Sequence, residues 1–215
     1  MVLDNYRTTL DWWLVPLAKG LRGVHPDVFT WSSLAVAAVG GVAFWRSGPT
    51  HDGLPLLLVA WVCVGVNSVL DLLDGKVAHL TGQATPRGDY LDHAVDRFSD
   101  TFFLLGLAFS AWVRVDVGLV ALVGTLLTSY MGTQAQAVGL RRDYKGLLGR
   151  ADRMVLLLVI PLAQWLWTTR HYPVPWFASL LEAMMAYFAL MGVLTTVQRF
   201  VGGLRGFDAK GQLKP

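Results

Sequence analysis

Apolar segments about as long as a membrane is thick follow one another along this chain and restrict its fold. A helix needs about 20 apolar residues to cross the roughly 30 Å hydrocarbon core of a bilayer. Only 15% of the residues are charged, whereas a typical soluble domain has about 25%. The sequence therefore predicts an all-α integral membrane protein with six transmembrane helices, at residues 27–46, 54–80, 88–113, 116–139, 152–170 and 174–200.

The segment that precedes these spans has a different pattern. Its large apolar residues recur at helical spacing: Leu3, Tyr6, Leu10, Trp13, Leu14 and Leu17. Charged residues lie between them, and the segment lacks the cationic start of a cleavable signal peptide. We predict an amphipathic interfacial helix over 1–23, a six-helix bundle over 24–200 and a cytoplasmic tail over 201–215, together forming a single membrane domain.

Positive charges are distributed unevenly between the two sides that six spans define. With both termini inside, the outer connections receive only Arg46, Arg114 and Arg170. Because cytoplasmic loops carry the excess of Lys and Arg, we expect a multi-pass protein of the cell membrane with both termini in the cytoplasm. The net charge of +3 is small and scattered, so no nucleic-acid partner is expected. The lone Cys63 excludes a disulfide framework or a zinc cluster.

Four aspartates gather at the cytoplasmic ends of the second and third predicted spans. They are Asp71, Asp74, Asp92 and Asp96. One ionised Asp at the centre of a membrane helix costs roughly 2.5–3.5 kcal/mol. Spacings of three and four residues place each pair on one helix face, and divalent cations with oxygen ligands would compensate the charge. We predict a metal site here; the alternative is a carboxylate network neutralised by Lys76, Arg87 and Arg97.

These aspartates belong to a longer motif. The residues follow the pattern Asp71-x2-Asp74-Gly75-x2-Ala78-His79-x8-Gly88-x3-Asp92-x3-Asp96. The pattern resembles D-x2-D-G-x2-A-R-x8-G-x3-D-x3-D, the signature of the CDP-alcohol phosphotransferase (phosphatidyltransferase) family. The departure is His79, where the family usually has Arg. Neutral His offers one donor where Arg offers a fork, so His79 would contact the nucleotide more weakly, Arg87 or another cation would take over this contact, or the nucleotide would differ.

The resemblance implies an enzyme of phospholipid biosynthesis. It would transfer a phosphatidyl or archaetidyl group from CDP-diacylglycerol or CDP-archaeol to a hydroxyl of a polar acceptor and release CMP. By resemblance, Asp71, Asp74 and Asp92 bind metal, and Asp96 is a metal ligand or the catalytic base. Two Mg²⁺ or Mn²⁺ ions would neutralise the carboxylates and polarise the pyrophosphate. A homodimer is expected from the family alone.

Nucleotide contacts are expected along the same motif. Gly75 and Ala78 lack bulk, so a nucleotide can approach the helix backbone closely there. His79 and Gly88 complete the predicted nucleotide-binding set by resemblance. Asp89 and Asp100 share the helix face of Asp92 and are expected to be supporting or solvated acids.

Basic residues near the fourth, fifth and sixth spans suit an acceptor that carries phosphate, since Arg grips phosphate through two donors. Arg150, Arg153 and Arg199 resemble basic positions of family members that use inositol phosphate. The segments GTQAQAVGL and GLLGRADR resemble archaetidylinositol-phosphate-synthase-like members of archaea. The stretch 129–136 carries no cation where inositol-phosphate users have basic residues. Inositol 1-phosphate or a glycerol phosphate is favoured, and an uncharged alcohol stays open. We expect Arg141, Arg142 and Lys145 to form a basic loop that attracts anionic headgroups.

Two other classes of membrane protein are alternatives. UbiA-like prenyltransferases use Asp-rich motifs resembling Asn67-x3-Asp71-x2-Asp74, but they need about nine spans and two distant motifs, and this chain is too short. A divalent-cation or proton-coupled transporter would place acids along a crossing pathway. Here the acids gather at one side.

Overall fold

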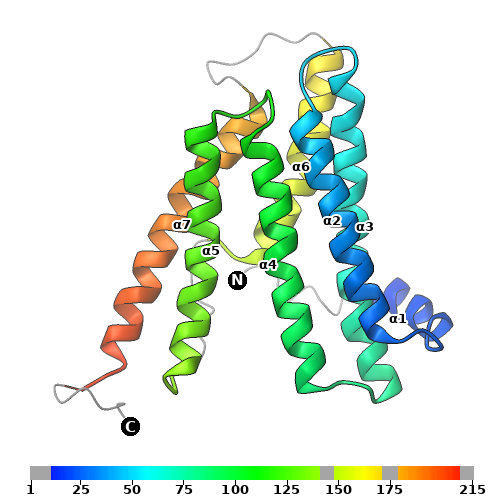
Figure 1. Cartoon of the computed structure of the whole chain (residues 1–215), viewed down its shortest axis with the longest axis vertical. Helices are drawn as coiled ribbons and strands as arrows, with labels where there is room; N and C mark the ends of the chain where they lie inside the picture. Colours follow the sequence, from blue (N-terminus) through cyan, green and yellow to red (C-terminus); the bar gives the residue numbers. More distant parts are fainter. Residues whose placement is uncertain (1–10, 141–147, 171–178, 209–215) are drawn as a thin grey trace.

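The computed structural model describes residues 11–140, 148–170 and 179–208, and its seven elements are all helices (Figure 1). This confirms the predicted all-α class. The predictions for residues 1–10, for Arg141, Arg142 and Lys145, for the start of the sixth span and for the end of the tail lie outside the described residues. The helices are α1 (Asp11–Gly20), α2 (Pro26–Arg46), α3 (Gly53–Thr81), α4 (Pro86–Ala108), α5 (Val115–Ala137), α6 (Arg150–Thr169) and α7 (Leu180–Arg205).

Five of these helices are long and apolar enough to cross a membrane, namely α2, α3, α5, α6 and α7. The predicted third span corresponds to α4, which does not meet this criterion because it carries several acids and bases, among them Asp89, Asp92, Asp96 and Asp100. The sixth predicted span ends at residue 200, whereas α7 continues to Arg205. Part of the predicted tail is therefore helical.

The turn between α3 and α4 is specified by local sequence. Gly82 ends α3 with a positive φ of 68°, a conformation that glycine adopts without steric cost. Thr85 then caps α4, because its Oγ1 accepts a hydrogen bond from the amide of Gly88 at 3.1 Å. Pro86 occupies the first turn of α4, where its missing N–H costs nothing. This short connection brings the end of α3 and the start of α4 to the same end of the molecule (Figure 1).

Small residues let two pairs of helices approach closely. Gly41 of α2 faces Gly106 of α4, and a Cβ atom on Gly106 would collide with the Gly41 backbone. Gly124 of α5 faces Gly192 of α7, where a Cβ atom on Gly192 would lie 3.0 Å from the Gly124 carbonyl carbon. Such contacts are typical of helix packing in membranes, where van der Waals contact drives association.

Polar contacts fix α3 against its neighbours near the predicted site. The Asn67 amide of α3 donates to the Ser33 carbonyl of α2 at 3.0 Å and to Ser99 Oγ of α4 at 3.4 Å. Earlier in α3, Trp61 Nε1 donates to the Leu158 carbonyl of α6 at 2.7 Å. Three helices are thus held in register around the chain segment that carries Asp71.

The short helix α1 packs beside the C-terminal part of α3 (Figure 1). Leu14 and Ala18 of α1 are buried in one apolar cluster with Leu73 and Val77 of α3. Lys76 Nζ lies 2.6 Å from a carboxylate oxygen of Asp11 at the start of α1. A helix is therefore present in part of the predicted interfacial segment, and its position on the membrane surface stays a prediction.

Candidate active site

The structure brings the four predicted aspartates together. Asp71 and Asp74 lie near the end of α3, and Asp92 and Asp96 lie in the first half of α4. The carboxylate of Asp74 interacts electrostatically with that of Asp92, and the carboxylate of Asp71 with that of Asp96. The two pairs that the spacing predicted therefore converge from two helices on one region.

Asp74 is held in place by contacts from two helices. Thr30 Oγ1 of α2 donates to Asp74 Oδ2 at 2.8 Å. The backbone amide of Gly75 donates to Asp74 Oδ1 at 2.5 Å. Both contacts are largely buried, so they restrict the orientation of this carboxylate before any ligand arrives.

The first residue of α6 reaches into the aspartate cluster. Arg150 donates two hydrogen bonds to Asp71, from Nη1 to Oδ2 at 2.9 Å and from Nη2 to Oδ1 at 3.0 Å. Arg150 Nη2 also lies 2.5 Å from Asp96 Oδ1. The sequence predicted Arg150 as a ligand of the acceptor phosphate. In this structure its guanidinium group instead pairs with two of the predicted metal ligands.

A second layer of charges lies deeper in the bundle. Asp100 is buried, and Arg153 Nη2 of α6 donates to its Oδ2 at 2.8 Å. Arg97 Nη2 lies 3.5 Å from the same oxygen and 3.7 Å from Asp96 Oδ2, while its Nη1 donates to Ser129 Oγ of α5. Asp100 is therefore a buried, paired acid and not a solvated one.

Arg199 enters this region from α7. Its Nη1 donates to the Thr128 carbonyl of α5 at 2.7 Å. Thr128 precedes Ser129, the partner of Arg97, so arginines from α4 and α7 reach the same turn of α5. The structure thus places the three predicted acceptor arginines around one end of the bundle, with Arg150 and Arg153 on acids and Arg199 on a backbone carbonyl.

In the alternative without a metal, Lys76, Arg87 and Arg97 would neutralise the aspartates. In the structure, two of these three cations pair with other residues. Lys76 pairs with Asp11 at 2.6 Å, and Arg87 pairs with Asp27 of α2 at 2.6 Å. Arg97 alone of the three contacts the cluster, through Asp96. Arg87 is also mostly exposed, with 72% of its side chain accessible.

The predicted nucleotide-binding positions lie on the accessible side of the cluster. Gly75 is exposed, and a Cβ atom added there would meet no described atom within 4 Å. Ala78 is half-buried and His79 is exposed one turn further along α3. Gly88 is half-buried at the start of α4. The space over Gly75 suits the close approach of a ligand that the motif predicts.

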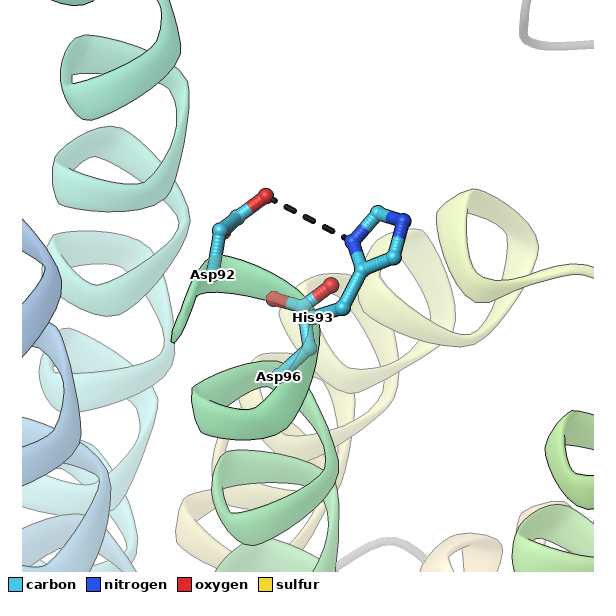
Figure 2. Close-up of side chains that lie close together, drawn as sticks. All are labelled: Asp92, His93 and Asp96. Carbon is cyan, nitrogen blue, oxygen red and sulfur yellow. Dashed lines mark ion pairs between the residues drawn. The ribbon is translucent and has the colours of Figure 1, made fainter. Parts of the chain in front are cut away.

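One residue of the site was not singled out from the sequence. His93 lies between Asp92 and Asp96 on α4, and one ligand atom from each of the three lies within 4.8 Å of the others (Figure 2). His93 Nδ1 is 3.7 Å from Asp92 Oδ2. The signal in the sequence is positional, because a residue directly after Asp92 and three before Asp96 borders the same helix face.

The donor groups of the cluster suit Mg²⁺ or Mn²⁺. Both ions prefer oxygen ligands, and Mn²⁺ also accepts imidazole nitrogen. Asp96 Oδ1 is buried and has no hydrogen-bond partner among the described residues, although the Arg150 guanidinium lies beside it. Arg150 compensates the charge of this oxygen in the present structure, and a divalent ion would do so in its place. The four carboxylates therefore fit a divalent-cation site.

A bundle of apolar helices with a carboxylate cluster and arginines at one end suits a multi-pass membrane protein that binds cations and phosphate groups. The chain belongs to the CDP-alcohol phosphatidyltransferase family, whose sequence profile matches residues 24–199. This assignment confirms the resemblance predicted from the aspartate motif. It replaces the two alternatives, the transporter and the prenyltransferase.

Relatives of known structure and name cover nearly the whole chain. The archaetidylinositol phosphate synthase of Methanothermobacter thermautotrophicus is 28% identical over 200 residues, 93% of each chain. The phosphatidylinositol phosphate synthase of Mycobacterium tuberculosis in its crystal structure with CDP-DAG aligns with a TM-score of 0.72 and 26% identity, covering 89% of this chain and 93% of that one. A crystal structure of the same enzyme with manganese and citrate aligns with a TM-score of 0.72 and 27% identity, covering 89% and 88%.

Proposed function

We propose that this protein transfers the phosphatidyl or archaetidyl group of a CDP-activated lipid to a hydroxyl of a polyol phosphate and releases CMP. The acceptor oxygen forms a new bond to the lipid-bearing phosphorus. The bond from that phosphorus to the oxygen bridging to CMP breaks, and CMP leaves with the electron pair. The observation that carries this proposal is the convergence of two carboxylate pairs, from α3 and α4, beside arginines of α4, α6 and α7.

Asp71, Asp74, Asp92 and Asp96 would hold two Mg²⁺ or Mn²⁺ ions, with His93 as a neighbouring donor. When bound, these ions neutralise the carboxylates and the pyrophosphate charge and make CMP a better leaving group. The chain's own contribution is to fix the carboxylates, through Thr30 and Gly75 on Asp74. A manganese-containing crystal structure of a relative supports this assignment.

Asp96 is suited to accept the proton of the attacking hydroxyl. Its side chain is only 10% exposed, whereas that of Asp92 one turn earlier is 36% exposed. The deeper carboxylate is shielded from water, and Arg97 and Arg150 flank it. A general base in such a position takes the proton from the acceptor and not from bulk water.

The donor lipid and the acceptor would approach from different sides. The nucleotide would lie over Gly75, Ala78, His79 and Gly88, where the end of α3 is accessible. His79 would supply one donor in place of the usual arginine fork, and Arg87, which is exposed and pairs with Asp27 through its Nη1, would add a second contact. Arg150, Arg153 and Arg199 would bind the acceptor phosphate, favouring inositol 1-phosphate or a glycerol phosphate over an uncharged alcohol.

The same proposal includes the arrangement in the membrane. α4 would complete a bundle of six spans because its charged residues, including the buried Asp96 and Asp100, are shielded by α2, α5 and α6. α1 would lie in the interface, and both termini and the site would face the cytoplasm of the cell membrane. A single domain and a homodimer are part of this proposal, the latter by family resemblance.

The test is CMP release from CDP-diacylglycerol and from CDP-archaeol by the purified full-length protein with Mg²⁺ or Mn²⁺. The acceptors are inositol 1-phosphate, the glycerol phosphates, serine and inositol, each also tested with EDTA. We expect release that requires both a divalent ion and one phosphorylated acceptor. Release with inositol or serine but not with any phosphorylated acceptor would contradict the acceptor class, and release that survives EDTA would contradict the metal dependence.

A further inference from the structure

Three guanidinium groups meet near the aspartate cluster, and each retains a nitrogen without a partner. Arg97, Arg150 and Arg153 donate through their terminal nitrogens to Ser129, to Asp71 and to Asp100. The Nε atoms of all three arginines are buried and have no hydrogen-bond partner among the described residues. Buried donors left in this state are costly, and three of them together favour an anionic ligand that accepts several hydrogen bonds.

Arg150 occupies carboxylate oxygens that a divalent ion needs. Its two terminal nitrogens engage both oxygens of Asp71, at 2.9 and 3.0 Å, and its Nη2 lies beside Asp96 Oδ1. A guanidinium group and a metal ion cannot lie at the same carboxylate lone pairs. The two cations are therefore competitors for Asp71 and Asp96.

The charges around Arg150 balance only while it stays on these acids. Three aspartates, Asp71, Asp96 and Asp100, face three arginines, Arg97, Arg150 and Arg153. If divalent ions take Asp71 and Asp96, Asp100 alone remains for three guanidinium groups, which leaves two positive charges in a largely buried region. A phosphate monoester carries nearly two negative charges near pH 7 and is bound by arginine through paired hydrogen bonds.

We propose that Arg150 exchanges partners during the reaction cycle: a divalent ion displaces it from Asp71 and Asp96, and the released guanidinium binds the phosphate of the acceptor. Binding of the metal then favours binding of the acceptor phosphate, and the reverse also holds. After the exchange, no residue contacts both the metal and the acceptor phosphate. This inference rests on the proposed function and adds an order to it, with the metal site filled before the acceptor phosphate is held tightly. Arg153 stays on Asp100 through its Nη2 and does not exchange, and its buried Nε is the atom that would bind the acceptor phosphate.

The first test measures Mn²⁺ affinity of the detergent-purified full chain, by the electron paramagnetic resonance signal of free Mn²⁺, without any lipid or acceptor. Removal of the competitor in Arg150→Met should tighten Mn²⁺ binding about tenfold, within the range usual for coupled sites. Arg153→Met is the matched control, because it removes a buried cation that pairs with Asp100 and not with a predicted metal ligand. Its Mn²⁺ affinity should change by less than about threefold.

Arg150→Lys keeps the test valid if Arg150→Met does not fold, because it retains the charge and loses the fork that engages both oxygens of Asp71. We expect its Mn²⁺ affinity to lie between those of the wild type and of Arg150→Met. An affinity equal to the wild type in the folded Arg150 variants would overturn the exchange. Equal tightening in Arg153→Met would also overturn it, because the effect would then be one of general charge.

The second test measures binding of inositol 1-phosphate by calorimetry, with Mn²⁺ or with EDTA. In the wild type we expect Mn²⁺ to raise the affinity about tenfold, and in Arg150→Met the same ratio should fall below about threefold. An unchanged ratio in Arg150→Met would overturn the coupling. Neither binding experiment depends on turnover, so the absence of CMP release would count against the proposed function, whereas an unaltered Mn²⁺ affinity would count against the exchange alone.

Discussion

The two carboxylates of α4 differ in their surroundings, although both belong to the motif. Asp92 is partly exposed and lies 3.7 Å from His93, whereas Asp96 is buried between Arg97 and Arg150. Burial favours the protonated form of a carboxylate, so the buried Asp96 is more suited than Asp92 to receive the proton of the acceptor hydroxyl. This difference supports the separate roles that the resemblance implies, with Asp92 as a metal ligand and Asp96 as the proposed base.

At the residue scale we predict that Asp96→Asn reduces the rate of CMP release by a factor of about 10² to 10⁴, the usual contribution of a general base. Asn has nearly the same shape but accepts no proton, so the helical fold should persist. The rate is measured at saturating CDP-lipid and Mn²⁺, with circular dichroism and gel filtration to check folding.

Asp89→Asn is the matched control for this experiment. Asp89 lies on the same helix with 75% of its side chain exposed, and we expect its rate to stay within about twofold of the wild type, as for other exposed substitutions. Full activity of Asp96→Asn in a folded preparation would exclude Asp96 as the base. A similar loss in Asp89→Asn would show that charge on α4, and not proton transfer, is responsible.

The relative positions of residues close together in the chain were predictable from the sequence. The spacing of the four aspartates predicted that they share helix faces, and the structure brings both pairs together. It did not predict that Arg150 pairs with Asp71, because 79 residues separate them and their contact depends on how α6 packs against α3. The partner of Lys76 was also missed, since Asp11 reaches it only through the docking of α1.

At the scale of the helices, close glycine contacts determine where the aspartates lie. α2 carries Thr30, which orients Asp74, and packs on α4 through Gly41 and Gly106. A change in the distance between α2 and α4 would therefore move Asp96 relative to Asp74. The small residues at this interface therefore help to position the aspartates of the site.

We predict that Gly106→Ala destabilises the protein by about 1–3 kcal/mol, as overpacking does in well-packed interiors. Its new Cβ atom would collide with the backbone of Gly41, which cannot move aside without displacing α2. Gly65→Ala is the matched control, because a Cβ atom there would meet Leu158 Cδ2 at an ordinary 3.7 Å. Unfolding in mixed detergent micelles gives both values; equal stability of the two variants would contradict this account of the α2–α4 contact.

The helix positions were largely predictable, and the polarity of α4 explains the main exception. The predicted spans 27–46, 54–80 and 116–139 agree with α2, α3 and α5 to within two residues at each end. α4 ends at Ala108 and not at residue 113. A single apolar run cannot show where a helix ends and an ordered turn begins, and residues 109–114 form such a turn with Trp112 buried.

For the whole molecule, the distribution of charge predicts which side of the membrane carries the site. The four aspartates lie in the halves of α3 and α4 next to the turn that joins these helices, whereas the α2–α3 turn lies at the other end of the molecule (Figure 1). We predict that Gln83→Cys, in a Cys63→Ala background, is labelled by an impermeant maleimide in inside-out vesicles and is protected in right-side-out vesicles. Asp52→Cys at the opposite end is the matched control and should show the reverse pattern.

Both test positions are exposed in the structure, so failure to label cannot be attributed to burial. Labelling of Gln83→Cys from the outside would place the aspartate cluster on the wrong face for a soluble cytoplasmic acceptor. Labelling of both variants from one side would contradict an odd number of spans between residue 52 and residue 83. The orientation itself rests on the Lys and Arg content of the connections.

In the proposed reaction the acceptor hydroxyl attacks the lipid-bearing phosphorus at this site. Isotope transfer tests this step, with an acceptor whose hydroxyl oxygens are ¹⁸O and whose phosphate is unlabelled, followed by mass spectrometry of both products. We predict one ¹⁸O in the phosphodiester of the lipid product and none in the released CMP. Label attached to the nucleotide phosphate, or an unlabelled lipid phosphate formed by water, would contradict the account.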